Sequence, residues 1–292
     1  MRVALRVEVH TLHGLGEGVP RLMRLFSDYQ VRASFFFPFG RDLSGREPLS
    51  AWRARRHIGR AALLYGTLLP APRLGEQSAR LMRLAASNGH DVGLLGGSPL
   101  LWRRRLANAG DGWVAAQLHA AWRACNDVMP DQGPAALATP AWQTAPAVLG
   151  AVNAERFRYT SMTRGRMPYL PLLQGVRSDV VEIPTTLPTV DEMLRQPGVD
   201  TTNVHEYLYA ESQHVRPAGH VFSLTAEREG GDRFALLEKL IVMWKGQEGS
   251  VRALQDVLHD LQPSTLPRHQ VGWAIPQGGD AYQATQSIEV PA

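Results

Sequence analysis

Val3-Ala-Leu-Arg-Val-Glu-Val-His-Thr11 is the first segment of the chain with a clear structural period. Apolar and polar residues alternate up to Val9, which predicts a β-strand, and three glycines between Thr11 and Gly18 predict a loop directly after it. Pro20 then falls in the first turn of an amphipathic helix, where a residue without an N–H is tolerated. Strand, loop and helix in this order form the repeating unit of an α/β fold.

The same unit recurs along most of the chain. Further strands are predicted at residues 31–37, 92–95, 135–138, 159–161, 180–183 and 219–225, with helices between them. This alternation predicts a parallel sheet with right-handed crossovers, and six to eight strands suit one (β/α) barrel over residues 1–262 better than two domains. In such barrels the chemistry lies on loops after the strands, where Thr11, Leu95, Trp142 and Thr225 fall.

Two segments depart from this alternation. Residues 41–75 are an insert that contains an amphipathic segment. Residues 263–292 are rich in Gln, Pro and Gly, so we expect a poorly ordered C-terminal tail.

The composition excludes several classes of protein. The 292 residues are 44% hydrophobic and 20% charged, and the net charge is +4. No apolar run approaches the roughly 18–20 residues that cross a bilayer, and the N-terminus lacks the layout of a secretory signal. We therefore expect a cytoplasmic protein. The single cysteine, Cys125, lies in a helix-like context and is predicted to be a buried thiol.

Arginines gather at one end of the amphipathic segment in the insert. The group precedes the apolar stretch 61–69 and comprises one tryptophan and four arginines: Trp52, Arg53, Arg55, Arg56 and Arg60. Such a segment can lie in the headgroup plane of an anionic membrane, although it is too short to cross. The alternative is a solvated helix face. Since no aromatic platform alternates with basic residues, we do not expect nucleic acid as a partner.

Three longer strings carry a resemblance to a known family. They are Gly16-Glu-Gly-Val-Pro-Arg-Leu22, Arg164-Gly-Arg-Met-Pro-Tyr-Leu-Pro-Leu-Leu173 and Ile183-Pro-Thr-Thr-Leu-Pro-Thr-Val-Asp-Glu192. With these strings, residues 1–262 resemble the polysaccharide-deacetylase (NodB-homology, carbohydrate esterase) family. The likeness is greatest to its deformylases acting on undecaprenyl-phosphate-linked 4-formamido-arabinose in lipid A modification. The resemblance implies a distorted NodB-type (β/α) barrel and, in active members, metal-dependent hydrolysis of an amide bond.

The resemblance also implies where the metal of active members would be held. Their first strand ends in an Asp-x-Asp-Thr-like string, which supplies a catalytic base and one metal ligand. This chain has Glu8 and His10 there. The two remaining ligands, histidines four residues apart, would fall at Leu95 and Pro99, whose side chains cannot coordinate a metal. We therefore expect no metal or other cofactor.

Two further groups implied by the resemblance are replaced. The arginine that orients the base would fall at Gln143, and an amide cannot supply a charged bidentate clamp. The general-acid histidine would fall at Thr225, whose hydroxyl has no pKa near neutrality. The family thus implies hydrolysis, whereas these residues argue for a pseudoenzyme.

Other interpretations of the site remain open at this point. A rebuilt metal site could use His10, His13 and His90, and the chain could be a working deacylase with a rearranged site. It could also be a structural subunit with a collapsed pocket. A Ser-His-Asp triad is not indicated, because no Gly-x-Ser-x-Gly string occurs.

Several residues fall in strings that resemble the family's substrate-framing loops, and we predict that they bind substrate. They are Arg164, Arg166, Tyr169, Thr186, Thr189 and Asp191. The alternative is that the prolines in these strings only shape barrel loops. The expected ligand is a lipid-linked sugar phosphate, and the expected partner is an active paralogue or another envelope-glycan enzyme. These expectations place the protein at the cytoplasmic face of the inner membrane.

Overall fold

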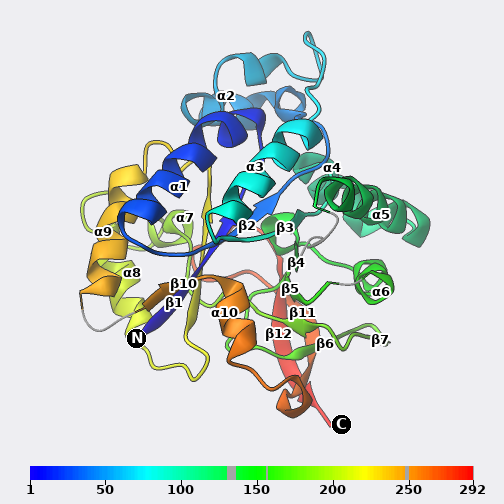
Figure 1. Cartoon of the computed structure of the whole chain (residues 1–292), viewed down its shortest axis with the longest axis vertical. Coiled ribbons are helices and arrows are strands. Elements are labelled where there is room, and N and C mark those ends of the chain that lie inside the picture. Colours follow the sequence, from blue (N-terminus) through cyan, green and yellow to red (C-terminus); the bar gives the residue numbers. More distant parts are fainter. Residues whose placement is uncertain (130–135, 156, 247–249, 292) are drawn as a thin grey trace.

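The computed structural model describes residues 1–129, 136–155, 157–246 and 250–291, and a parallel sheet forms its centre (Figure 1). The strands of this sheet are β1 (Arg2–Glu8), β2 (Ser34–Phe37), β3 (Asp91–Leu95), β4 (Ala136–Ala138), β5 (Tyr159–Ser161), β8 (Val181–Glu182), β9 (His220–Thr225) and β10 (Ser250–Arg252). Six of them lie in the order β1-β2-β3-β4-β5-β8, and both β9 and β10 pair with β1. Strand β1 pairs with β9 over Val3–Glu8, with β2 over Arg6–Glu8 and with β10 over Arg2–Ala4. All pairs are parallel, as the alternation predicts.

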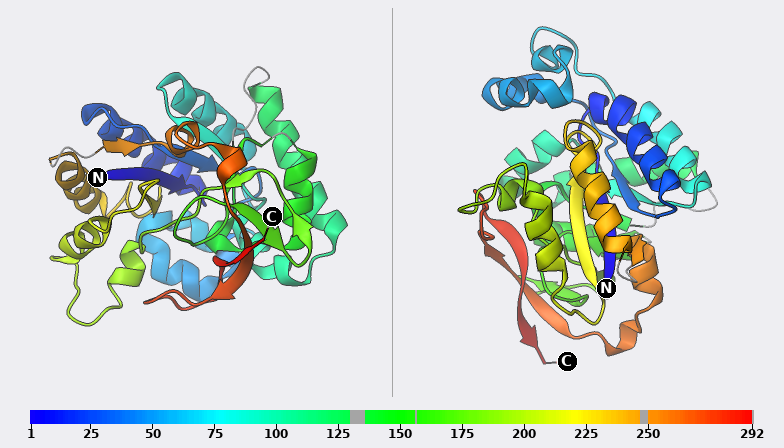
Figure 2. Two further views of the ribbon diagram at one scale, coloured as in Figure 1. Left: turned by 90° about the horizontal axis from the view of Figure 1, so that it is seen from below. Right: turned by 90° about the vertical axis from the view of Figure 1, so that its left-hand side faces the viewer.

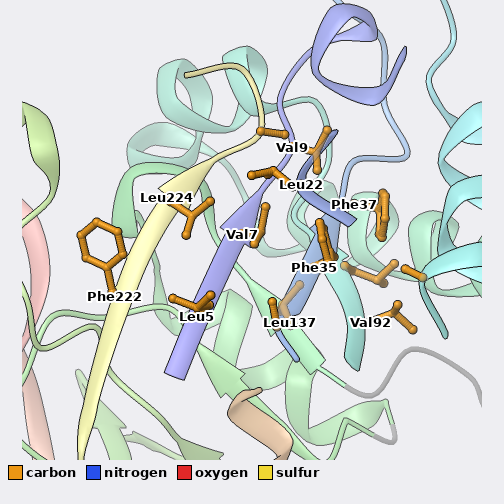
Figure 3. Close-up of a cluster of buried hydrophobic side chains, with 14 of the residues drawn as sticks. Leu5, Val7, Val9, Leu22, Phe35, Phe37, Val92, Leu137, Phe222 and Leu224 are labelled. Atoms are coloured by element: carbon orange, nitrogen blue, oxygen red, sulfur yellow. The ribbon is translucent and has the colours of Figure 1, made fainter. Parts of the chain in front are cut away.

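Helices connect these strands, and most of them cover the outer face of the sheet, whereas the last packs Leu254 and Val257 against its inner face. They are α1 (Val19–Asp28), α3 (Gly75–Ser87), α4 (Pro99–Arg105), α5 (Asp111–Val128), α6 (Pro146–Ala154), α7 (Val190–Met193), α8 (Val204–Ser212), α9 (Phe234–Lys245) and α10 (Leu254–His259). Apolar side chains of β1, β2 and β9 pack beneath them, as Figure 3 shows for Leu5, Val7, Phe35 and Phe222. The sheet curves into a half-barrel with surrounding helices, which confirms the predicted α/β barrel class.

The interior of the half-barrel is lined by the alternate residues of the same strands. Ala4 of β1, Phe36 of β2 and Leu95 of β3 belong to a second apolar cluster on this side. Because successive side chains of a strand point to opposite faces, Arg6 and Glu8 share the interior face with Ala4. The gap between β8 and β9 is bridged by the segment after β8, in which the Thr186 and Leu187 N–H groups donate to Val221 O at 3.1 Å.

The insert forms a separate layer at one end of the barrel. It contains α2 (Pro48–Ile58) and a short 3-10 turn (Ala61–Leu64), and it lies above α1 and α3 at the top of Figure 1. This is the end at which the sheet strands β1, β2 and β3 finish.

Residues 263–292 differ from the poorly ordered tail that the composition predicts. They contain β11 (Arg268–Ala274) and β12 (Gln283–Val290), an antiparallel pair that we call the C-terminal hairpin (orange to red in Figure 2). Strand β11 also pairs with β6 (Leu170–Leu173), which pairs with β7 (Val176–Arg177). The Gln, Pro and Gly residues that suggested disorder lie mainly between and before the strands, whereas Val271 and Ala284 are buried against the barrel.

Packing of the C-terminal hairpin can be measured by replacing one buried residue. We expect Val271→Ala to lower the free energy of unfolding by about 2 kcal/mol, because it removes buried methyl groups and leaves a cavity. Ile288→Ala on the same hairpin is the matched control, since Ile288 is 64% exposed. Urea unfolding followed by circular dichroism gives both values. Equal, negligible effects in the two variants would show that the hairpin is not packed.

Candidate functional site

A cavity of about 250 Å³ opens at the C-terminal ends of β1 and β9. Its walls come from segments far apart in the sequence. The lining includes Glu8, His10, Trp142, Thr189, Asp191, Ser223, Thr225, Glu229, Arg233, Gly279, Asp280 and Gln283. The cavity therefore occupies the face of the barrel at which the sequence places functional residues.

A chain of charged groups runs from the barrel interior into this cavity. The Arg6 guanidinium is fully buried and forms an ion pair with Glu8 Oε1, while Glu8 Oε2 lies 2.6 Å from His10 Nε2. Arg6 also donates to Ser223 Oγ at 2.8 Å and to Ser161 O at 3.0 Å. We call Arg6, Glu8 and His10 the charged triad; the side chains of Arg6 and Glu8 are buried, whereas that of His10 is 33% exposed. The alternation of β1 creates this triad, because Arg6 and Glu8 point to the same face.

Contacts within the charged triad shift the pKa values of Glu8 and His10. Burial alone would raise the pKa of Glu8, but the Arg6 charge and the hydrogen bond with His10 lower it to about 2. For His10 burial opposes the charged form, yet the hydrogen bond and the charge of Glu8 raise its pKa above the ordinary 6.5. Glu8 is thus an ionised carboxylate with both oxygens engaged, and His10 tends toward the imidazolium form.

Two further carboxylates, those of Glu227 and Glu229, hold the loops around the cavity. Glu227 Oε1 accepts hydrogen bonds from the His10 and Thr11 N–H groups and from Thr11 Oγ1, each at 2.9 Å. Glu229 Oε2 accepts from Thr225 N at 2.7 Å, so the threonine at the implied general-acid position is tied to a neighbouring carboxylate.

The positions that the family resemblance singles out do not all meet at the cavity. Glu8, His10 and Thr225 line it. Leu95 is fully buried in the interior apolar cluster. Pro99 begins α4 and lines a neighbouring cavity, and Gln143 donates from Nε2 to Tyr282 O at 2.6 Å.

Of the six residues predicted to bind substrate, Thr189 and Asp191 line the cavity. Arg164 lies one layer behind it, with Nη2 at 3.0 Å from Glu192 Oε2 and its guanidinium over the Trp142 ring. The other three have different surroundings. Tyr169 is buried with its hydroxyl at 2.9 Å from Thr163 Oγ1, Thr186 bridges to β9, and the side chain of Arg166 is exposed.

Sequence reasoning placed Trp142 on a functional loop without giving it a role, and it missed Arg6, Arg233 and the C-terminal hairpin. The alternation of β1 contained a signal for Arg6, because residues two apart on a strand share a face. Arg233 pairs with Asp191 and with Glu229, and the spacing from Glu229 was visible on the chain. Nothing local predicted that Gln283 would reach this cavity.

A second cavity of about 390 Å³ adjoins the first, and both are lined by His10, Arg103, Asp191 and Thr225. One face of α2 forms its wall through Ala51, Ala54, His57 and Ile58. The opposite face of the same helix carries Trp52, which is 57% exposed. The amphipathic insert therefore covers a cavity with one face and presents arginines and tryptophan outward with the other.

The alternative metal site is not assembled. His90 precedes β3 at the opposite end of the strands, where its Nδ1 accepts from Ala33 N and its ring packs against Phe26 and Phe35. Burial lowers its pKa to about 4. In the part of the chain that the structure describes, no three His, Cys, Asp or Glu side chains are grouped so that they could hold a metal ion.

Comparison with solved structures identifies the class of fold. A protein of Mycobacterium smegmatis described as a polysaccharide deacetylase superposes with a TM-score of 0.60 at 18% identity, over 91% of this chain and 92% of that one. A carbohydrate esterase family 4 pseudoenzyme of Bacillus anthracis superposes with a TM-score of 0.50 at 14% identity, over 88% and 65%. The half-barrel is thus the NodB-type barrel of polysaccharide deacetylases.

A curated relative identifies the family within this class. No family model matches the sequence. The chain is, however, 31% identical over 263 residues to a protein of Shewanella sediminis named as a 4-deoxy-4-formamido-L-arabinose-phosphoundecaprenol deformylase, and the match covers 84% of this chain and 81% of that protein. The chain belongs to this deformylase family. Among the described residues, no helix has the length and apolar character needed to span a membrane.

The charged triad predicts a pH-dependent contribution of His10 to the free energy of unfolding. A group whose folded pKa is raised stabilises the fold below its unfolded pKa and loses that effect as the pH rises through the folded value. We therefore expect wild type to be more stable than His10→Gln below pH 6.5, and this advantage to decrease as the pH rises through the raised pKa of folded His10. Urea unfolding of both proteins well below and well above pH 6.5 measures this. A difference that does not change with pH would contradict the pairing of His10 with Glu8.

Proposed function

We propose that this chain is a non-catalytic member of the deformylase family that binds a lipid-linked sugar phosphate. The observation that carries the proposal is the state of Glu8, whose two carboxylate oxygens are engaged by Arg6 and His10. A general base is most effective when its pKa lies near the working pH. With a pKa of about 2, Glu8 is a poor proton acceptor at neutral pH.

The residues present do not fit the divalent metal that the family implies. A metal site needs converging N, O or S donors, and the implied ligand positions hold His10, Leu95 and Pro99. Leu95 is packed among apolar side chains, and His10 is already engaged by Glu8. A catalytic metal lowers the pKa of bound water from 15.7 to about 7, and each general acid or base contributes about 10²- to 10⁴-fold in rate. Loss of these groups together removes the family route to amide hydrolysis.

Ligand binding is supported by the two adjoining cavities. The first is lined by charged residues that include Asp191, Glu229 and Arg233, and the second has an apolar wall from Ala51, Ala54 and Ile58. Arg103 lines both, and its side chain is 49% exposed with Nη2 at 3.3 Å from Glu47. A sugar in the first cavity, a phosphate at Arg103 and the start of a lipid chain along α2 match this sequence of surfaces. By holding such a ligand, the protein would act beside an active paralogue or another envelope-glycan enzyme.

Metal content and turnover test the loss of catalysis. We expect purified protein to retain no stoichiometric zinc after a zinc soak and desalting, and to release no formate from a 4-formamido-arabinose substrate. Elemental analysis and a formate assay give the two values, with His10→Ala and Glu8→Gln as variants. One tightly held ion that disappears in His10→Ala, or turnover that disappears in Glu8→Gln, would instead establish a working deacylase with a rearranged site.

Contact with the cytoplasmic face of the inner membrane is the second part of the proposal. The outer side of the insert exposes apolar side chains at Leu49, Trp52, Leu64, Leu68 and Leu69. Arg55 stacks on the Trp52 ring with its guanidinium carbon 4.1 Å from the ring centroid, while Arg56 and Arg60 are exposed. The side chain of Arg53, the fifth predicted contact, lies outside the described residues. Amphipathic segments of this kind bind anionic lipid surfaces through apolar burial plus phosphate attraction.

Liposome flotation tests the membrane contact. We expect binding to phosphatidylglycerol-containing vesicles but not to neutral ones, and loss of binding in high salt, because each arginine contributes about 1 kcal/mol through a screened field. Combined replacement of Arg55, Arg56 and Arg60 by serine should abolish binding. Serine at Arg24, Arg80 and Arg83, which are exposed on α1 and α3, is the matched control. Equal recovery in the soluble fraction with all lipids would refute the contact.

A further inference from the structure

The C-terminal hairpin supplies one wall of the first cavity through Gly279, Asp280 and Gln283. Contacts on both sides of Gln283 hold this wall against the barrel. On one side Arg195 donates to Asp280 Oδ2 at 2.9 Å. On the other side Arg164 N donates to Ala284 O at 2.8 Å, so the position of Gln283 is set from two directions.

Gln143 adds a contact to the residue next to Gln283. Its Nε2 donates to Tyr282 O at 2.6 Å. The family resemblance places a base-orienting arginine at position 143, and here the same position anchors the C-terminal hairpin instead. Position 143 therefore helps to hold a wall of the cavity in this chain.

The side chain of Gln283 is 9% exposed and has an unused acceptor. Its Nε2 lies 3.5 Å from Glu192 Oε1, whereas Oε1 is buried and has no donor among the described residues. Buried polar atoms are nearly always hydrogen-bonded, because an unpaired one loses its bonds to water without replacement. Gln283 lines the cavity, but Oε1 itself is shielded from it. A turn of the side chain away from its long contact with Glu192 would present this acceptor to a ligand that brings a donor.

The chemistry of the neighbouring groups limits the ligand class. The hydroxyl groups of Thr189, Ser223 and Thr225 line the same cavity, and so does Asp191, whose side chain is 52% exposed. Hydroxyl groups both donate and accept, so a molecule with several hydroxyl or amide groups matches this lining. We propose that Gln283 is a specificity-determining residue whose Oε1 accepts a hydrogen bond from a hydroxyl or amide N–H of a bound sugar. Gln143 is its positioning residue; both assignments rest on the proposed ligand-binding function.

Titration calorimetry with 4-deoxy-4-formamido-L-arabinose 1-phosphate tests the role of Gln283. We expect Gln283→Leu to weaken binding about tenfold, since the sugar donor would face an apolar side chain. Gln270→Leu on β11 is the matched control, because Gln270 is exposed on the same hairpin, and it should bind like wild type. Thermal unfolding checks that the variants are folded, and Gln283→Met replaces the leucine variant if that one is not.

A double-mutant cycle separates positioning from a general structural effect. Gln143→Leu should also weaken binding, and the double variant with Gln283→Leu should bind no more weakly than Gln283→Leu alone. Full additivity would contradict the positioning role. If wild type and Gln283→Leu bind the sugar phosphate equally, the inference about Gln283 fails while the proposed function stands. If wild type does not bind the sugar phosphate, both fail.

Discussion

The ion pair between Arg6 and Glu8 is the interaction around which the barrel interior is organised. A buried guanidinium requires a negative partner and further acceptors, because an unpaired charge in the interior is strongly unfavourable. Arg6 obtains them from Glu8, Ser223 and Ser161, which belong to three different strands. The rings of Phe36 and Trp142 cover the guanidinium. One charge therefore ties β1, β9, β5 and the loop after β4 together.

This arrangement also determines the chemistry available at the strand ends. The carboxylate that faces the cavity is engaged by Arg6 and His10, and these contacts hold its pKa at about 2. The deformylase family and the NodB-type barrel are established by the comparisons, whereas the reaction depends on individual side chains. The barrel therefore fixes where the cavity lies, and the paired side chains fix the charges that it presents.

The C-terminal hairpin is held against the barrel by contacts of the same kind. Gln143 contacts the backbone of Tyr282, and Arg164 contacts both Glu192 and the backbone of Ala284. Two positions that the family resemblance singles out thus contribute to holding a distant segment in place. The cavity is formed by the barrel and the hairpin jointly, and neither element alone encloses it.

The sequence by itself determined the α/β barrel, because alternating and helical periods are local properties that residues such as Val3–Val9 display without their neighbours. It also located Glu8, His10 and Thr225 at strand ends. Only the tertiary structure decided that Gln143 binds Tyr282 and that Gln283 lines the cavity. These contacts join segments far apart in the chain, and no local pattern encodes such a meeting. The pair of Arg6 and Glu8 lies within β1, so the alternation contained its signal, but the burial that makes it an ion pair depends on the surrounding strands. Composition made residues 263–292 resemble a disordered tail, whereas pairing with β6 and burial of Val271 and Ala284 give them a fixed structure.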